Sequence, residues 1–298
     1  MSENKNLEYF NGDELAASVW KSKYALEGEE TADDLHKRLA KEFARVEKKY
    51  QKQELQFAKN GSAADRSKYG LKRENLTEES IYQLFKDFKY IVPQGSIMYG
   101  LGRKDKFISL SNCFFIGQPI DSYGGIMQKD EELVQLMKRR GGVGIDISTL
   151  RPSETPVSNS AGTSTGAISF MERFSNSTRE VGQNSRRGAL MITIDINHPD
   201  VKEFAKIKSD LTKVTGANIS IRLNKEFMKA VENDEDYLLQ FPCNNLPRKT
   251  PDINSMEYNK LYKGELVGIK GNLYLKRIKA KEYWDEIIKS ARNNAEPG

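Results

Sequence analysis

Cysteine and histidine are both scarce in this chain: its 298 residues contain two cysteines, Cys113 and Cys243, and two histidines, His36 and His198. Two cysteines in a chain of this length exclude a disulfide framework and indicate a reducing, cytoplasmic environment. The histidines lie far apart, and no Cys/His cluster has the spacing of zinc ligands, so the sequence predicts no metal site. His198 stands in "NHPD", where the pattern favours a cap for the helix that begins at Pro199.

Long apolar runs are absent as well. No stretch of 18 apolar residues occurs, and the N-terminus lacks a charged and then apolar leader, so the sequence predicts no membrane span and no secretory signal. Charge of either sign has only a small excess, because 47 Lys and Arg stand against 42 Asp and Glu, a net +5. Such a bias suits an anionic small molecule as well as nucleic acid and decides neither. Hydrophobic residues, at 38%, suffice for one large domain or two smaller ones.

Periodicity divides the chain in two. Residues 13–60 and 78–89 have the apolar spacing of helices, with Thr77 at the start of the second. From residue 91 onward, short apolar runs typical of strands alternate with helical patterns. We expect a helical N-terminal domain over 1–90 and an α/β sheet or barrel over 91–298. The expected strands are 90–102, 107–117, 141–148, 189–196, 216–223 and 236–242, with a hairpin at 263–277; the expected helices are 130–140, 166–182, 198–209, 224–234 and 280–294.

One candidate for chemistry is Cys113, in "LSNCFFIG", flanked by Asn112, a hydrogen-bonding neighbour that a core strand does not need. Two readings are open. Composition alone favours a buried structural cysteine. The alternative is a redox thiol that points into a pocket.

Two further segments are rich in glycine or polar residues. Glycines 141, 142 and 144 would let a backbone approach a ligand or another strand closely, but the segment is neither a dinucleotide fingerprint nor a phosphate-binding P-loop. The stretch "NSAGTSTG" supplies hydroxyls at the start of a helix, and "QNSRRGA" follows its end. Arginine forks bind phosphate and amides can read base edges, so this second stretch is either a nucleotide-contacting loop or a solvated turn.

Taken together, the motifs "LSNCFFIG", "KRRGGVGIDIS", "NSAGTSTGAISFMERFSNSTREV", "RRGALM" and "HPD" resemble the catalytic (large) subunit of ribonucleotide reductase. The similarity runs in order from about residue 76 to the C-terminus. It is strongest to the adenosylcobalamin-dependent class, although the subunit-dependent class shares these motifs. The resemblance implies a ten-stranded α/β barrel of two antiparallel halves, of which residues 91–298 would form the first half.

The resemblance also implies roles for single residues. Cys113 matches the family's first redox cysteine, one of the pair that becomes a disulfide as the ribose is reduced. Ser96, Asn112 and Gly142 match positions that line the substrate and its phosphates, and Asn112 replaces a serine found in some members.

An allosteric site is implied too, with a deoxynucleoside triphosphate or ATP as effector. Asp121, Ser122 and Tyr123 would face this effector, with Arg151 near its phosphates. The loop between effector and substrate base would be the specificity loop, in which Ser185 stands where many relatives carry glycine; its residues are Gln183, Asn184, Ser185, Arg186 and Arg187. The site implies a homodimer through helices near 130–140 and 166–182.

Other family features are missing from these 298 residues. No Asn-x-Cys-x-Glu motif, which carries the radical cysteine and an acid/base glutamate, occurs, and Cys243 does not have that context. The second redox cysteine, the C-terminal thiol pair and the N-terminal ATP-binding cone are also absent. We therefore expect that the chain alone is inactive and that a second chain carries the C-terminal half, as in a split gene, an intein-interrupted precursor or a truncated sequence.

The other expected partners follow from the same resemblance. They are a nucleotide substrate, a thioredoxin-type reductant, and either adenosylcobalamin or a radical-generating subunit, with neither nucleic acid nor a membrane. Two alternatives stay open: a non-catalytic deoxynucleotide-binding module, and an unstable remnant that binds nothing. A redox thiol favours the enzyme, because a pure binding module has no use for one.

Overall fold

A computed structural model describes residues 2–59, 76–155, 157, 159–181, 188–242, 267–270 and 273–298. The chain divides into two compact units, Met1–Asn112 and Cys113–Gly298. The domain boundary expected at residues 90 and 91 lies inside the first unit, and as a statement about domains it stays a prediction. Across the described ranges, no helix is both long enough and apolar enough to cross a membrane.

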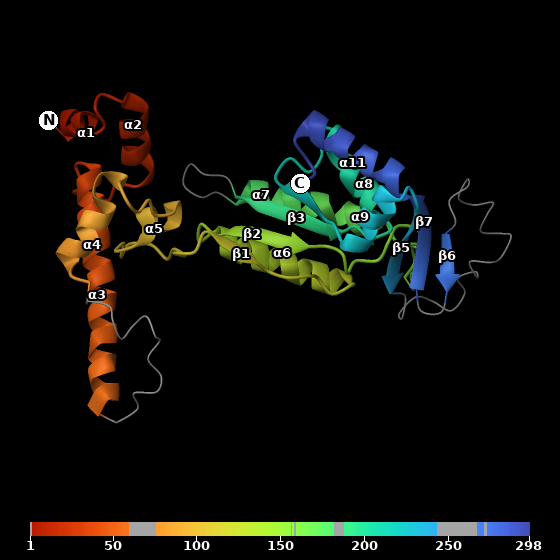
Figure 1. The fold of residues 1–298 in the computed structure, drawn as a ribbon, viewed down its shortest axis with the longest axis horizontal. Helices are drawn as coiled ribbons and strands as arrows, with labels where there is room; N and C mark the ends of the chain where they lie inside the picture. Colours follow the sequence, from red (N-terminus) through yellow and green to blue (C-terminus); the bar gives the residue numbers. More distant parts are fainter. Residues whose placement is uncertain are drawn as a thin grey trace. The chain divides into compact units, whose positions relative to one another are not determined.

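The first unit is helical, as the sequence predicts (Figure 1). Helix α3 has an apolar face whose residues Leu35 and Leu39 are fully buried and pack with Trp20, Ile81 and Phe85. The start of α4 is fixed by a reciprocal cap between the Thr77 and Ser80 side chains and main-chain N–H groups. The helices of this unit are α1 Ser2–Tyr9, α2 Glu14–Lys23, α3 Ala32–Lys59, α4 Glu78–Phe85, η3 Lys86–Phe88 and α5 Gly95–Gly100.

The strand expected at 90–102 is wrong, because this segment contains helix α5. Ile97, Met98 and Leu101 pack against the helical core of the first unit. A short apolar run fits a strand or a buried helical turn equally well, and here the contact with neighbouring helices decides.

The second unit is built on four parallel strands in the order β1-β2-β3-β4: β1 Cys113–Phe115, β2 Gly142–Asp146, β3 Leu190–Asp195 and β4 Asn218–Arg222. They alternate with helices along the chain, as expected. The helices are α6 Tyr123–Met137, η4 Ala167–Phe170 with α7 Met171–Glu180, α8 Val201–Lys206 with η5 Ile207–Ser209, α9 Lys225–Glu232 and α11 Ala280–Asn294. Helix α11 has the expected bounds.

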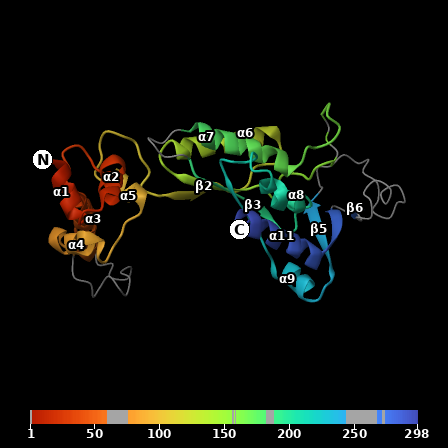
Figure 2. The ribbon, with the colours of Figure 1, turned by 90° about the horizontal axis from the view of Figure 1, so that it is seen from above.

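The two faces of this sheet differ. Sequential parallel strands joined by right-handed crossovers place the connecting helices on one face. In Figure 2, α6 and α7 lie side by side next to β2. On that face Ile145, Ile192 and Ile219 are buried among helical residues of the core. On the other face Phe115 is 71% exposed and Met191 38% exposed. The sheet therefore has one helix-covered face and one open face.

A three-stranded antiparallel sheet follows, in the order β5-β7-β6. Its strands are β5 Asp236–Pro242, β6 Val267–Lys270 and β7 Leu273–Lys279. The pairing of β6 with β7 confirms the hairpin expected at 263–277. The four-stranded parallel sheet is what the described residues show of the expected half barrel, and the ten-stranded barrel itself stays a prediction.

Candidate functional site

Four residues expected at an effector site line one cavity of about 240 Å³. Asp121, Ser122 and Tyr123 come from the segment that enters α6, and Arg151 comes from the segment that follows β2. The rest of the wall is formed by α6, η4 and the loop between β2 and η4: Ile126, Val157, Asn159, Ala161, Thr163, Ser164, Thr165 and Phe170. Residues from two distant segments thus converge on one hollow.

Asp121 and Arg151 hold these two segments together. The Asp121 carboxylate accepts a hydrogen bond of 2.8 Å from Arg151 Nε and one of 3.1 Å from the Arg151 main-chain N–H, across 30 residues of sequence. Their side chains are 28% and 20% exposed, so the pair is partly shielded from water. Charge-assisted bonds of this kind are stronger than neutral ones and fix the arginine at the cavity wall.

The N-terminus of α6 also opens at this cavity. Ser122 caps the helix, with its Oγ accepting a hydrogen bond of 3.0 Å from the Gly125 N–H. Gly125 packs so tightly that an added Cβ would lie 2.4 Å from the Ile120 carbonyl oxygen. The unpaired N–H groups and positive end of a 15-residue helix favour an anion at this position.

Aromatic and hydroxyl groups complete the wall. Tyr123 is 60% exposed and lies edge-to-face with Phe170, with 6.1 Å between ring centroids. The two arms of the loop pair through the hydrogen bond from Glu154 N–H to the Ser164 carbonyl oxygen, 2.8 Å. The Thr165 and Ser169 hydroxyls are 2.8 Å apart. The cavity can therefore offer ring contacts, hydroxyls and a cation to one ligand.

Cys113 is exposed at the start of β1, which excludes a buried structural cysteine. In the parallel register its partner is Gly142 on β2, and Phe115 is paired with Gly144 two residues further on. Because neighbours in register point to the same side of a sheet, Cys113 and Gly142 share the open face with Phe115. At Gly144 an added Cβ would lie 3.6 Å from Cδ2 of the Phe115 ring, so this ring packs over the glycine.

A polar network on the open face was not expected from the sequence. Asp146 is 1% exposed and accepts hydrogen bonds from Ser148 N–H at 2.9 Å, Gln118 Nε2 at 3.1 Å and Thr193 Oγ1 at 3.2 Å, and it pairs with Arg222 Nε at 2.9 Å. Burial by itself would raise the pKa of the Asp146 carboxyl, but the hydrogen bonds from Ser148 and Gln118 and the charge of Arg222 hold it below its usual value.

Arg222 also lines a cavity of about 310 Å³ with Asp195, its second carboxylate partner at 3.1 Å. This cavity lies beyond the carboxyl ends of β3 and β4, where ligands bind in open parallel sheets. In the sequence this site is marked only by charged residues at the ends of the strands. Such residues are common there, and the sequence does not show which of them form pairs.

The expected substrate residues fall in both units. In the first unit, the Ser96 N–H donates to Asn112 Oδ1 at 2.9 Å, and Asn112 Nδ2 bonds Gln94 Oε1. Ser96 is fully buried, and its hydroxyl has no hydrogen-bond partner within the described ranges. Cys113 and Gly142 belong to the second unit. Contact of these residues with a substrate stays a prediction.

Two expected features lie outside the described residues. The specificity loop, Gln183 to Arg187, falls between α7 and β3, and Cys243 follows β5. Their predicted roles are neither supported nor opposed by the structure.

The resemblance also implied adenosylcobalamin or a radical-generating subunit. Three cavities in the described part of the second unit have volumes of about 440, 240 and 310 Å³. Each is too small to enclose a corrinoid with its nucleotide, so none of them fits this cofactor, and no step below passes through it.

Comparison with known proteins agrees with the resemblance. Residues 111–298 match the model of the family "Ribonucleotide reductase, barrel domain". The chain is 32% identical over 210 residues to a vitamin B12-dependent ribonucleoside-diphosphate reductase of Thermoplasma acidophilum, covering 70% of this chain and 23% of the relative. It is 28% identical over 192 residues to a reductase of the same description from Mycobacterium tuberculosis, covering 63% and 24%.

A relative with a different description matches as well. The large subunit of ribonucleoside-diphosphate reductase from Caenorhabditis elegans is 27% identical over 189 residues, covering 60% of this chain and 23% of the relative. The chain thus spans about a quarter of the length of the relatives that it matches.

Proposed function

Because this chain belongs to the ribonucleotide reductase family and forms part of a catalytic subunit, we propose that it holds the effector site and one redox thiol of that enzyme. The observation that carries the proposal is the single cavity lined by Asp121, Ser122, Tyr123 and Arg151. The resemblance to the family implies an effector site at these same four residues.

The chemistry of the cavity fits a deoxynucleoside triphosphate. Arg151 and the N-terminus of α6 would stabilise the phosphates, because both favour negative charge. The Asp121 carboxylate has lone pairs for a ribose hydroxyl, beyond those that Arg151 uses. Tyr123 supplies an exposed ring for apolar contact.

On the open face, Cys113 would act as one of two thiols that reduce the ribonucleotide. In the balanced reaction the ribose hydroxyl leaves as water, two thiols lose their hydrogens and form a disulfide, and a deoxyribonucleotide results. A thioredoxin-type reductant would restore the thiols. The exposure of Cys113 beside Gly142 supports this role.

The second thiol, the radical cysteine and the acid/base glutamate would come from the rest of the barrel, supplied by a further chain. The radical would start outside the part of the chain that the structure describes, at a cofactor bound by the rest of the enzyme or at a separate subunit. The enzyme would work as a homodimer in the cytoplasm, and this chain alone would reduce nothing. A non-catalytic nucleotide-binding module is the second candidate, which the same cavity supports.

Calorimetric titration of the chain with each deoxynucleoside triphosphate tests the effector site. We expect binding by the natural chain and at least about tenfold weaker binding by Arg151→Gln, since a charge-assisted contact is lost. Arg103→Gln is the control, because Arg103 is also paired with an aspartate, Asp105 at 3.0 Å, but does not line this cavity. Absence of binding, or equal binding by Arg151→Gln, would contradict the proposal.

Reductase activity separates the two candidates. The chain is mixed with a chain that carries the rest of the barrel, with dithiothreitol as reductant and with or without adenosylcobalamin. Activity in the mixture that disappears with Cys113→Ser supports the enzyme. Effector binding without activity in any mixture would leave the binding module.

A further inference from the structure

The base of the loop that lines the effector cavity is closed by one buried carboxylate. Asp200, at 3% exposure, accepts hydrogen bonds from the Ser153 N–H at 3.1 Å, from Ser153 Oγ at 3.2 Å and from the Ala167 N–H at 3.1 Å. Ser153 and Ala167 are the two ends of the loop whose middle forms the cavity wall. The Asp200 side chain, which belongs to a different segment, therefore links the two ends of the loop.

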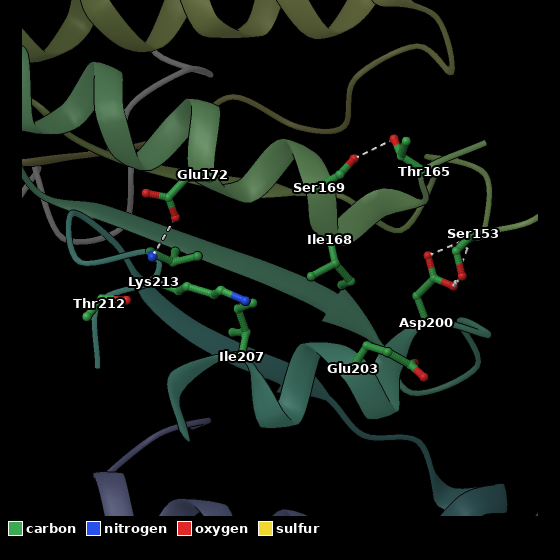
Figure 3. Close-up of a pocket in the computed structure, with 11 residues that line it drawn as sticks. Ser153, Thr165, Ile168, Ser169, Glu172, Asp200, Glu203, Ile207, Thr212 and Lys213 are labelled. Atoms are coloured by element: carbon green, nitrogen blue, oxygen red, sulfur yellow. Dashed lines mark hydrogen bonds between the residues drawn. The ribbon is translucent and has the colours of Figure 1, made fainter. Parts of the chain in front are cut away.

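Figure 3 shows Asp200 at the wall of a second cavity, of about 440 Å³, where its carboxylate points at Ser153. Thr165 lines this cavity as well as the effector cavity. The loop therefore lies between the two cavities and contributes to the lining of both. At Gly166, where φ is 83°, an added Cβ would lie 2.6 Å from Asp200 Oδ2, so the carboxylate is packed directly against the loop backbone.

The Asp200 side chain does not perform the role that its position suggests. Asp200 is the residue before the first turn of α8, where aspartate commonly accepts a hydrogen bond from its own helix. No such side-chain cap is present. The carboxylate is directed to the loop instead, 33 residues earlier in the sequence at Ala167.

His198 holds Asp200 in place. Its Nδ1 accepts a hydrogen bond of 3.0 Å from the Asp200 N–H, so Nε2 carries the proton and donates to the Leu150 carbonyl oxygen at 2.7 Å. Burial lowers the pKa of the His198 ring, which keeps it neutral and able to accept at Nδ1. The "HPD" motif therefore anchors the backbone on both sides of Arg151, at Leu150 and Ser153.

We propose that Asp200, fixed by His198, is a positioning residue of the effector cavity: it holds the loop from Ser153 to Ala167 closed so that Arg151 and Thr165 face the same bound nucleotide. This inference rests on the proposed effector function. Asp200 acts through the loop backbone and does not line the effector cavity itself.

The test compares Asp200→Asn with Glu203→Gln. Both variants remove one negative charge from the wall of the second cavity. The Ser153 and Ala167 N–H groups now each donate to a carboxylate oxygen, and in Asp200→Asn one of these oxygens becomes an NH₂ group, which cannot accept. Glu203 makes no hydrogen bond to this loop in the part of the chain that the structure describes. Hydrogen exchange of the Ser153 and Ala167 amides is measured without nucleotide, and calorimetry gives the Kd for deoxynucleoside triphosphates.

We expect Asp200→Asn to speed exchange of both amides and to raise the Kd about tenfold, and Glu203→Gln to leave both at the natural values. Phe227→Leu, which thins the core on α9, serves as a destabilised reference. If Asp200 contributes only to overall stability, Asp200→Asn and a reference variant with the same Tm should have the same Kd.

Three outcomes are separable. Faster exchange with weaker binding by Asp200→Asn, at a Tm matched by the reference, supports the inference. Unchanged Kd for Asp200→Asn, with normal binding by the natural chain, overturns it and leaves the effector site intact. No binding by the natural chain overturns the effector site and, with it, the role assigned to Asp200.

Discussion

The guanidinium of Arg222 on β4 lies 2.9 Å from the buried carboxylate of Asp146 on β2, and it reaches across β3 to do so. It also pairs with Asp195 on β3 at 3.1 Å. Three neighbouring strands are thus tied together on the open face by one side chain. The network holds the pKa of the Asp146 carboxyl below its usual value, on the face of the sheet that the described helices leave open.

This relationship predicts a modest stability cost for Arg222→Met. The arginine is half exposed, so we expect a loss of only about 1 kcal/mol in the free energy of unfolding, because the remaining donors still satisfy Asp146. Urea denaturation measures it. Arg139→Met, which removes an arginine bonded within its own helix region at Gln135, is the control and should change stability less. Equal effects of the two variants would refute a cross-strand role.

Gly125 and Gly124 form a matched pair for testing the start of α6. Gly125→Ala places a Cβ 2.4 Å from the Ile120 carbonyl oxygen, while at Gly124 the nearest atom, Ser122 Oγ, is 4.0 Å away. We expect Gly125→Ala to cost about 2 kcal/mol or more and to weaken nucleotide binding, since backbone must shift at the cavity. Gly124→Ala should be neutral or stabilising by about 0.5 kcal/mol, because it reduces the freedom of the unfolded chain. Thermal unfolding and calorimetry with the same nucleotide report both effects, and equal loss by both variants would contradict the packing argument.

His36 predicts a pH dependence of the first unit. Its ring is fully buried, lies 4.6 Å from the Phe88 ring centroid, and has no hydrogen-bond partner for either nitrogen within the described ranges. Burial lowers the pKa of His36 below 6.5, and the nearby Asp33 and Asp87 carboxylates only partly oppose this. Tyr9 is hydrogen-bonded to Asp87 and Tyr82 to Asp33, and Lys37 pairs with Asp33 at 2.7 Å.

The sign follows from proton uptake. In the unfolded chain His36 takes up a proton near pH 6.5, whereas in the folded chain its pKa is lower. The free energy of unfolding is therefore at its full value above pH 6.5 and decreases as the pH falls from 6.5 toward the lowered pKa of the folded state. Thermal unfolding between pH 5 and pH 8 measures it. His36→Met should reduce the slope of stability against pH. Both proteins retain His198 in the second unit, so its contribution to the pH dependence is the same in each. The same slope with and without His36 would contradict the prediction.

Cys113 predicts a reactive surface thiol. In a Cys243→Ser background, the folded chain should be alkylated by iodoacetamide at a rate within about tenfold of the urea-unfolded chain, because the side chain is exposed. Mass spectrometry of the native protein gives the rate. Modification that occurs only after unfolding would show that the thiol is covered.

Much of the fold was predictable because its signals are local. Strand and helix patterns alternate from β1 to α9, and Thr77 marks the start of α4. The segment at α5 was wrong because six residues of apolar sequence do not contain a period that separates helix from strand. Packing against the neighbouring helices decided that segment.

The candidate site shows the same division. The family resemblance implied a shared site for Asp121 and Arg151, and both line one cavity. Sequence composition favoured burial of Cys113, and its exposure was decided by the sheet, whose other face is covered by helices of the described part of the chain. The pattern favoured His198 as the cap of a helix that begins at Pro199, whereas α8 begins at Val201, and the carboxylate of Asp200, the residue before it, bonds a loop instead.

The sequence by itself determined the family, the alternation of strands and helices from β1 to α9 and the residue types available for nucleotide chemistry, since these depend on local spacing and on motifs read along the chain. Tertiary structure alone decided which face of the sheet stays open, that Arg222 reaches Asp146, and that Asp200 bonds both Ser153 and Ala167. Each of these depends on hydrogen bonds between residues far apart in sequence, and such contacts exist only once the strands and helices have packed.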